Sequence, residues 1–449
     1  MNKFKQVGKK SFLRVARSRP LFGEIEVSGA KNMVTKIMTT CLIATKGRLL
    51  IKNVPIINDV FITLKLFDQL GIRYKLNSDK SLEIWPKGFK SSTLAFEGED
   101  GNRIPLLLAA PLLAQLGRAV IPKPKGCKIG TRKIDFHISG LQQFGVRIKE
   151  DEQNLHLEIS KKGLVGTTVN LPFPSVGATE NMIMTAVCAQ GASRINNCAI
   201  EPEIIELIKF LQRSGVNVVI HEGRSIYICG NRDISLTEVT IIPDRVETMS
   251  YAAAAIATKG DVFVKGADHD SLISPISALL DIGAGVDIKD NGIRFYYKGS
   301  IKRGNIETEV YPGFQTDFQQ PLAIVLSQAN GASRIHEKIF ESRFIYLQML
   351  NKMIKNRNKA GLTISKECPP ESQCRFAGQE YAHTALINGP VKFGSGEIEI
   401  PDLRAGFAIL IAGLLSDGMI IRNLDSLFRG YDNPVGKLNS LGANIEMFE

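Results

Sequence analysis

One pattern of apolar and polar positions recurs along the chain. Stretches with apolar residues three and four apart end near a glycine, and a short stretch rich in β-branched residues follows. The first spacing predicts an amphipathic helix and the second a strand. Glycine readily takes the left-handed conformation that closes a helix. The first set of such glycines is Gly47, Gly117, Gly191, Gly260, Gly331 and Gly418.

A second set of glycines follows the first at a similar distance. It comprises Gly71, Gly145, Gly215, Gly283 and Gly442, with Gly361 as the best candidate in the fifth repeat. Each repeat is therefore predicted to run helix, strand, helix and two strands, as in residues 49–54, 61–70, 72–76 and 81–85. Six repeats of about 70 residues fill the chain. Coincidence would explain one such glycine but not six at near-equal spacing.

The interval before the last repeat is longer than the others, which indicates an insertion near residues 352–385. It contains a basic stretch, 352–359, and two cysteines, Cys368 and Cys374. A structural zinc site needs a second close pair of cysteines or histidine partners. Only His383 is near along the chain, so we expect a plain loop and no metal site.

Composition narrows the class of protein. Of the 449 residues, 44% are hydrophobic and 22% charged, as in folded globular proteins. The apolar run 407–415 is much shorter than the roughly 20 residues that span a bilayer. Seven cysteines without regular spacing indicate a reducing compartment. Strand-like residues 12–15 and 24–27 argue against a transit peptide, so we expect a cytoplasmic protein.

The net charge of +11 suits an anionic partner: nucleic acid, an acidic lipid surface or a phosphorylated small molecule. Composition alone does not choose among them. Basic residues are scattered, aromatic residues make up only 7%, and no base-stacking motif is present, which disfavours nucleic acid.

A Pro- and Gly-punctuated loop, residues 122–132, places Cys127 among four basic residues. Neighbouring positive charge makes a thiol more reactive. Ser28–Asn32 follows a predicted strand and opens a helix, so Lys31 could bind an anion there. Asp317 is either a helix cap or a general base. Asp402 and Arg404 stand together at another helix start, and Arg429 lies at a turn.

These motifs, in this order and over essentially the whole chain, resemble those of the enolpyruvyl transferase family. The resemblance rests on residues 28–32, Arg103, 126–127 with Arg132, 135–141, 175–179, 201–203, 243–248, 316–317, 340–344, 402–405 and 429–431. It implies a two-domain, inside-out α/β barrel of six βαβαββ repeats, three per domain. Residues 1–27 plus 243–449 would form a discontinuous domain, and residues 28–242 an inserted domain carrying the Cys127 loop. Hinges would lie near residues 21–30 and 235–245, with the active site in the cleft.

The resemblance also implies a reaction. The enolpyruvyl group of phosphoenolpyruvate would pass to the 3-hydroxyl of UDP-N-acetylglucosamine with release of phosphate, the first committed step of peptidoglycan precursor synthesis. Asp317 matches the base, and Cys127 matches the acid that fosfomycin attacks. No metal or organic cofactor is implied. We expect a monomer or weak homo-oligomer, without nucleic-acid or membrane partners.

The remaining family positions map onto this chain as binding residues. The cations that match the phosphoenolpyruvate cradle are Lys31, Arg103, Arg132, Arg404 and Arg429. Asn32, Asp402 and Glu201 match orienting residues. The nucleotide segments match Arg132, Lys133, Ile134, Asp135 and Phe136, together with Ser175, Val176 and Gly177. Ile339 and Arg343 match the lining of the sugar-nucleotide site.

Residues 33–36 and the insertion near 352–385 depart from the family pattern, and so do three single positions. Lys133 replaces a proline, Phe173 a lysine near the nucleotide, and Phe428 an aspartate. They leave open a paralogous transferase that acts on another nucleotide or sugar nucleotide, and a non-catalytic homologue. The shikimate-pathway relative is disfavoured because it lacks a cysteine on the 122–132 loop.

Overall fold

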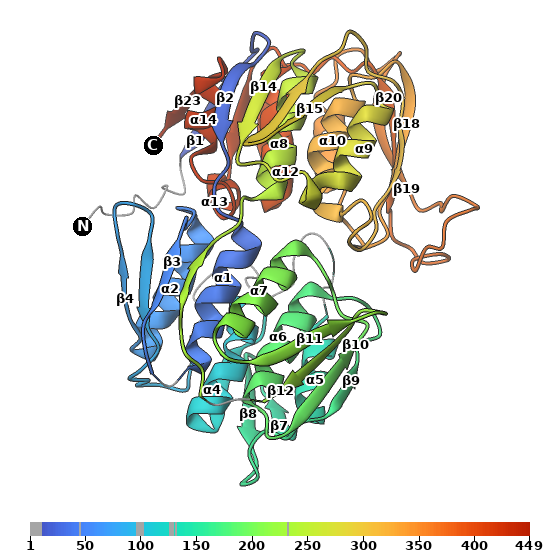
Figure 1. Cartoon of the computed structure of the whole chain (residues 1–449). Coiled ribbons are helices and arrows are strands. Elements are labelled where there is room, and N and C mark those ends of the chain that lie inside the picture. The colour runs from blue at the N-terminus through green and yellow to red at the C-terminus, as the bar shows by residue number, and fades with distance from the viewer. Residues whose placement is uncertain (1–10, 45, 96–102, 125–129, 131–132, 231–232) are drawn as a thin grey trace. The chain divides into compact units, whose positions relative to one another are not determined.

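The computed structural model describes residues 11–449 apart from residues 45, 96–102, 125–129, 131–132 and 231–232. The chain folds as two compact units, shown in Figure 1. Unit 1 contains residues 11–28 and 243–449, and unit 2 contains the described residues of 29–124 and 133–242. Each unit has its own hydrophobic core.

Unit 2 contains three sheets, in the orders β13-β3-β5-β4, β6-β8-β7 and β11-β12-β10-β9. Its strands are β3 (Leu49–Lys52), β4 (Arg73–Leu76), β5 (Leu82–Trp85), β6 (Arg118–Pro122), β7 (Val146–Glu150), β8 (Asn154–Ile159), β9 (Thr168–Asn170), β10 (Ala192–Asn196), β11 (Asn217–His221), β12 (Ser225–Cys229) and β13 (Glu238–Thr240). Its helices are α1 (Lys31–Thr40), the 3₁₀ turn η1 (Cys41–Ile43), α2 (Asn58–Leu70), α3 (Ile104–Leu107), α4 (Ala109–Leu116), α5 (Asp135–Gln143), α6 (Val176–Cys188) and α7 (Pro202–Arg213).

Unit 1 also contains three sheets, in the orders β15-β16-β14-β2, β17-β18-β20-β19 and β21-β22-β1-β23. Its strands are β1 (Phe12–Ala16), β2 (Phe22–Glu26), β14 (Asp261–Lys265), β15 (Gly285–Lys289), β16 (Gly292–Tyr296), β17 (Asn305–Glu307), β18 (Gly331–His336), β19 (Gly361–Ser365), β20 (Thr384–Gly389), β21 (Gly396–Glu399), β22 (Met419–Arg422) and β23 (Asn444–Phe448). Its helices are α8 (Arg245–Ala257), η2 (Asp270–Leu272), α9 (Ile273–Asp281), η3 (Thr316–Phe318), α10 (Gln319–Leu326), α11 (Ile345–Asn351), α12 (Leu403–Leu414), α13 (Leu424–Phe428) and α14 (Pro434–Ser440).

The centre of unit 1 is helical. Helices α8, α10 and α12 pack against one another, and every residue of α8 and α10 is buried. Helices that are apolar on all sides belong inside a protein. The sheets surround them, so the predicted inside-out architecture is confirmed. Outer helices such as α7 bury one face only, with Ile204, Leu207 and Leu211 at spacings of three and four.

The second set of predicted glycines is confirmed in five repeats. Gly71, Gly145, Gly215, Gly283 and Gly442 all have positive φ angles. The candidate Gly361 is wrong, because α11 ends at Asn351 and Gly361 begins β19 without a positive φ. In the first set, Gly260 is the exception. Lys259 takes the left-handed conformation there, and a Cβ on Gly260 would lie 2.1 Å from the Leu21 carbonyl oxygen.

Three sheets contain a strand that is distant in the sequence. In unit 1, β1 pairs antiparallel with both β22 and β23, and β2 pairs parallel with β14. In unit 2, β13 pairs parallel with β3. None of the helices that the structure describes combines the length and the apolar character needed to cross a membrane.

Candidate active site

Asp317 lies between two arginines of unit 1. Arg343 Nη2 donates to its Oδ1 at 2.7 Å, and Arg404 Nε donates to its Oδ2 at 3.1 Å. Both arginine side chains are about 95% buried, whereas the carboxylate is a quarter exposed. Asp317 lies in η3 and does not cap α10, so of the two roles predicted for it only that of a chemical group remains open.

The charge of Arg343 is held by its surroundings. Burial acts to lower the pKa of its guanidinium, but Asp317, Asp402 and Glu337 together raise it above its usual value. Arg343 Nη1 also donates to Thr316 Oγ1 at 2.7 Å. Thr316 in turn donates to Glu337 Oε2 at 2.7 Å. Arg343 is therefore a fixed cation held by a network of hydrogen bonds that includes Asp317, Thr316 and Glu337.

Arg404 lies in the first turn of α12, the last central helix of its unit. Asp402 caps α12 by accepting bonds from the backbone N–H groups of Arg404 and Ala405, at 3.0 and 3.1 Å. This confirms the helix start predicted at Asp402. Burial, opposed by Arg343, raises the pKa of the Asp402 carboxyl. Arg404 Nη1 is buried and has no hydrogen-bond partner among the described residues, which leaves one strong donor for an anion.

Glu337 is buried, and sequence reasoning missed it. Its Oε1 accepts bonds from Thr308 Oγ1 at 2.9 Å and from the Ile339 N–H at 2.8 Å. Ile339, one of the predicted binding residues, is thereby held at the start of the segment that carries Arg343. Arg429, at the C-terminal cap of α13, is partly buried. Glu337 could not be recognised from the sequence, because a single acidic residue in a polar stretch gives no local signal that it holds a neighbouring segment.

In unit 2, Lys31 opens α1 as predicted and pairs with Asp59. The Lys31 Nζ to Asp59 Oδ2 distance is 3.0 Å, and the carboxylate is almost fully buried. Gly29 is required just before the helix, because a Cβ there would lie 2.0 Å from the Asn53 carbonyl oxygen. Asn32 is the next residue of α1 and is partly buried. Asp59 was missed, since an acid in the first turn of α2 is ordinary.

Lys31 interacts electrostatically with a group of buried carboxylates in unit 2. Glu180 on α6 lies 3.9 Å from Lys36 Nζ, and Glu201 is the N-cap residue of α7. Burial raises the pKa of Glu180 to about 7. Lys36 acts to lower this pKa, and Glu203 and Glu201 act to raise it further. Because Lys31 also acts on Glu180, the predicted residues Lys31 and Glu201 belong to one electrostatic cluster.

The two predicted nucleotide segments lie at the starts of neighbouring helices. Asp135 opens α5 and Ser175 caps α6 through the Ala178 N–H, at 3.4 Å. The helices pack together, and His137 Nδ1 lies 3.0 Å from Asn181 Nδ2. Ser175, Val176 and Gly177 are therefore near Asp135 and Phe136.

Arg103 lies beside the first of these segments. Its Nη1 donates to the carbonyl of Lys133 at 3.4 Å, next to Ile134. The described residues predicted for the site in unit 2 thus lie at the starts of helices α1, α3, α5, α6 and α7, where backbone N–H groups favour anions. Cys127 and Arg132 lie outside the described residues.

Comparisons with known proteins identify the family to which this chain belongs. The family model for EPSP synthase (3-phosphoshikimate 1-carboxyvinyltransferase) matches residues 15–438. The UDP-N-acetylglucosamine 1-carboxyvinyltransferase of Protochlamydia amoebophila is 40% identical over 444 residues, covering 97% of this chain and 94% of that protein. This chain belongs to the enolpyruvyl transferase family. The enzyme of the same name from Finegoldia magna is 34% identical over 440 residues, covering 97% of this enolpyruvyl transferase and 99% of its relative.

Solved structures share the fold of this enolpyruvyl transferase at low sequence identity. The enolpyruvyl transferase NikO from Streptomyces tendae has a TM-score of 0.83 at 18% identity, covering 98% of this chain and 99% of its own. EPSP synthase from Acinetobacter baumannii has a TM-score of 0.71 at 17% identity, covering 98% and 100%. The predicted fold class is confirmed.

Proposed function

We propose that this enolpyruvyl transferase moves the enolpyruvyl group of phosphoenolpyruvate to the 3-hydroxyl of UDP-N-acetylglucosamine and releases phosphate. The observation that carries the proposal is the 40% identity, over nearly the full length of both chains, to enzymes named for that acceptor. The reaction would supply the precursor pathway of peptidoglycan, with phosphoenolpyruvate and the sugar nucleotide as its partners.

The reaction needs one base and one acid. The acceptor hydroxyl adds to C2 of phosphoenolpyruvate while a proton goes to C3, and phosphate then leaves as C3 loses a proton. We assign the base to Asp317. A carboxylate has about four lone-pair directions, so two arginine bonds leave acceptor capacity for the hydroxyl proton. We assign the acid to Cys127, which lies outside the described residues.

Cations are needed for the phosphate and the carboxylate of phosphoenolpyruvate. Arg404 suits this role because its buried Nη1 has a free donor. We assign Lys31, Arg103, Arg132 and Arg429 to the same substrate. Asn32, Asp402 and Glu201 are proposed to orient it.

The acceptor is proposed to bind at the helix starts of unit 2. The N-termini of α5 and α6 offer backbone N–H groups to a diphosphate. Lys133, Ile134, Asp135, Phe136, Ser175, Val176 and Gly177 belong to this set. Ile339 and Arg343 of unit 1 are assigned to the sugar.

A second acceptor class is favoured by the departures in unit 2. Phe173, at a position where the family usually has lysine, removes one charge near the nucleotide. An acceptor with fewer phosphates, such as a nucleoside monophosphate, would need that charge less.

An acceptor screen tests both candidates. Phosphate release would be measured with phosphoenolpyruvate and one acceptor at a time: UDP-N-acetylglucosamine, UMP or shikimate 3-phosphate. We expect turnover with UDP-N-acetylglucosamine, and mass spectrometry should show the enolpyruvyl adduct. Turnover with UMP alone would establish the second candidate, and no turnover with any acceptor would favour a non-catalytic homologue.

A further inference from the structure

The fifth repeat differs from the others at one hairpin. Strands β15 and β16 are joined by residues 290–291, and β11 and β12 by residues 222–224. The corresponding strands β19 and β20 are joined by residues 366–383, which contain no helix or strand. Loops longer than about 12–15 residues without secondary structure are uncommon in compact domains and are usually functional. This loop therefore needs something that holds it.

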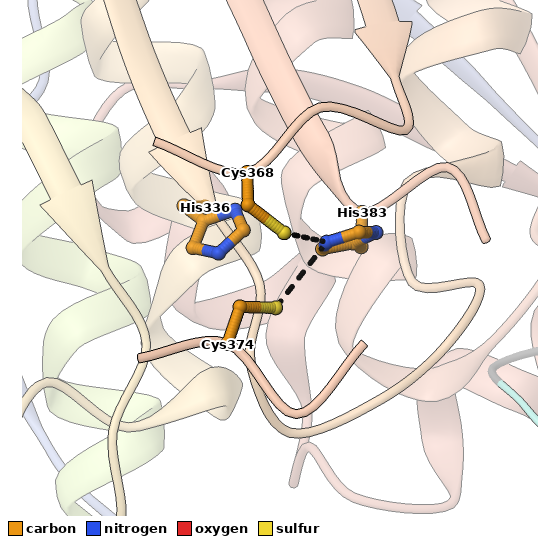
Figure 2. Close-up of side chains that lie close together, drawn as sticks. All are labelled: His336, Cys368, Cys374 and His383. Carbon is orange, nitrogen blue, oxygen red and sulfur yellow. Dashed lines mark hydrogen bonds between the residues drawn. The ribbon is translucent and has the colours of Figure 1, made fainter. Parts of the chain in front are cut away.

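Two cysteines of the loop meet two histidines at its base. Cys368 Sγ and Cys374 Sγ each lie 3.3 Å from His383 Nε2. His336, the last residue of β18, completes the group, and all four ligand atoms lie within 4.8 Å of one another. Figure 2 shows both sulfurs directed toward the His383 ring, with the His336 ring on their other side. The expected plain loop is therefore contradicted by a cluster that includes His336, which is distant from the cysteines along the chain.

The hydrogen bonds of both histidines fix which nitrogen is free. Thr384 Oγ1 donates to the Glu367 carbonyl at 2.5 Å, so it accepts from His336 Nδ1 at 2.7 Å. His336 Nε2 is then unprotonated, and it is buried without a partner among the described residues. A carbonyl can only accept, so His383 Nδ1 donates to the Tyr381 carbonyl at 2.6 Å. Nδ1 bonds of this kind typically orient metal-binding histidines.

One hydrogen bond at the site favours a thiolate at Cys374, and the histidine ligands are shielded from water. The Phe376 N–H donates to Cys374 Sγ at 3.4 Å, which favours a negatively charged sulfur. The Phe376 ring is buried and packs edge-on against His383, with centroids 5.5 Å apart. Both histidines are fully buried and both cysteines are partly buried.

We propose that Cys368, Cys374, His383 and His336 bind one structural Zn²⁺ ion. Tetrahedral zinc at about 2.3 Å from sulfur and about 2.0 Å from nitrogen sets neighbouring sulfur and nitrogen atoms about 3.5 Å apart. The two distances of 3.3 Å are close to that value. Binding releases one proton from each thiol, and two thiolates neutralise the charge of the ion. Four protein ligands leave no open position, so the ion holds the loop and does not take part in the reaction.

The zinc site is also joined to the Asp317 network. His336 directly precedes Glu337, which binds Thr316. Arg375, next to Cys374, donates from Nη2 to the Ile339 carbonyl at 2.7 Å. Loss of the ion should therefore loosen both the loop and the segment that carries Arg343.

Metal analysis of the full-length chain tests the proposal without reference to activity. The protein would be expressed with added zinc, purified without a metal-binding tag and dialysed before elemental analysis. We expect about one zinc ion per chain in the wild type, and less than a tenth of that in the double variant Cys368→Ser/Cys374→Ser. The matched control is Cys229→Ser, at an exposed cysteine of unit 2, which should keep its zinc.

A second measurement uses the unaltered chain, so it does not depend on the folding of a variant. Chelated protein would be refilled with Co²⁺ and its visible spectrum recorded. The intense bands of tetrahedral, thiolate-bound cobalt would support the site, whereas the weak bands of octahedral cobalt would overturn it. Undiminished zinc in the double variant would overturn it too. So would metal-free wild-type protein whose intact mass is lower by two hydrogens, since Cys368 and Cys374 would then form a disulfide.

Discussion

At the scale of single residues, Asp317 combines two demands. As a base it must offer an oxygen to a hydroxyl, and as an anion it offsets two buried guanidinium groups. Arg343 and Arg404 each take one of its oxygens. A change at this position should therefore alter both turnover and stability, by separable amounts.

Asp317→Asn keeps the shape of the side chain and removes its charge. We expect kcat to fall about 10²–10⁴-fold, the usual contribution of a general base, with little change in KM. The free energy of unfolding should fall by about 3–5 kcal/mol, because two buried cations lose their counter-charge. Steady-state kinetics and urea unfolding measure the two effects.

Asp261→Asn is the matched control. Asp261 also accepts two arginine bonds in unit 1, from Arg294, but on an outer sheet. The kcat of the Asp261→Asn variant should stay near the wild-type value. A near-normal kcat for Asp317→Asn would remove Asp317 from the role of base.

Cys127 should react selectively with fosfomycin. Its basic loop favours the thiolate, the form that attacks an epoxide. Burial raises the pKa of the Cys198 thiol to about 12, so that thiol stays protonated. We expect one adduct by intact mass and loss of activity. Cys127→Ser should abolish the adduct and Cys229→Ser should not, whereas an unchanged wild-type mass would contradict the assignment.

Glu180 should make stability depend on pH. Its folded pKa of about 7, raised chiefly by burial, exceeds the value of about 4.3 for an unfolded glutamate. Between those values the folded chain holds more protons, so the free energy of unfolding falls as the pH rises. Glu180→Gln removes this titration and should reduce the fall in the free energy of unfolding between pH 5 and pH 8 by on the order of 2 kcal/mol.

Urea unfolding at pH 5 and pH 8 measures that difference. Glu206→Gln, at a surface carboxylate paired with Lys209, is the control and should keep the wild-type slope. If Glu180→Gln keeps it as well, Glu180 does not hold its proton near neutral pH.

At the scale of elements, the glycines that end helices are not equivalent. Gly215 follows α7 with φ +90° and has open space where a Cβ would lie. Gly361, assigned from the sequence to the same place in the fifth repeat, begins a strand. Gly215→Ala should therefore cost about 1–2 kcal/mol from backbone strain alone, and Gly361→Ala much less. Thermal unfolding of both variants measures these losses of stability. Equal losses would show that the backbone angle φ does not determine the destabilisation.

The elements themselves could be predicted because their signals are local. Apolar spacing and helix-ending glycines predicted β4, β5 and the end of α2 to within one residue, whereas the start of α2 was placed three residues too late. Gly260 and Gly361 were misassigned because a close backbone approach and a displaced helix end come from tertiary structure. The same reason applies to the site. The helix start at Asp402 could be predicted from its neighbours, whereas Glu337 reaches Thr316 only in the folded chain.

At the scale of the whole molecule, the pairings that close each unit join residues far apart in the sequence. Periodicity predicts that six repeats exist but does not state which strands complete a sheet. The pairing of β1 with β22 and β23, and that of β13 with β3, had no local signal. The Cys and His cluster is of the same kind, since β18 and β20 bring His336 and His383 together.

Unit 2 should fold by itself. The core of unit 2 is drawn only from residues between Ala30 and Ile241, and β13 completes its first sheet within that span. A domain with its own core is expected to fold independently. A fragment of residues 28–242 should unfold cooperatively in urea, followed by circular dichroism, and should bind no zinc. A fragment of residues 28–235 lacks β13 and leaves the edge of β3 unpaired, so it should unfold at lower urea and aggregate. If the longer fragment shows no cooperative transition while the full chain does, the two cores fold only as one.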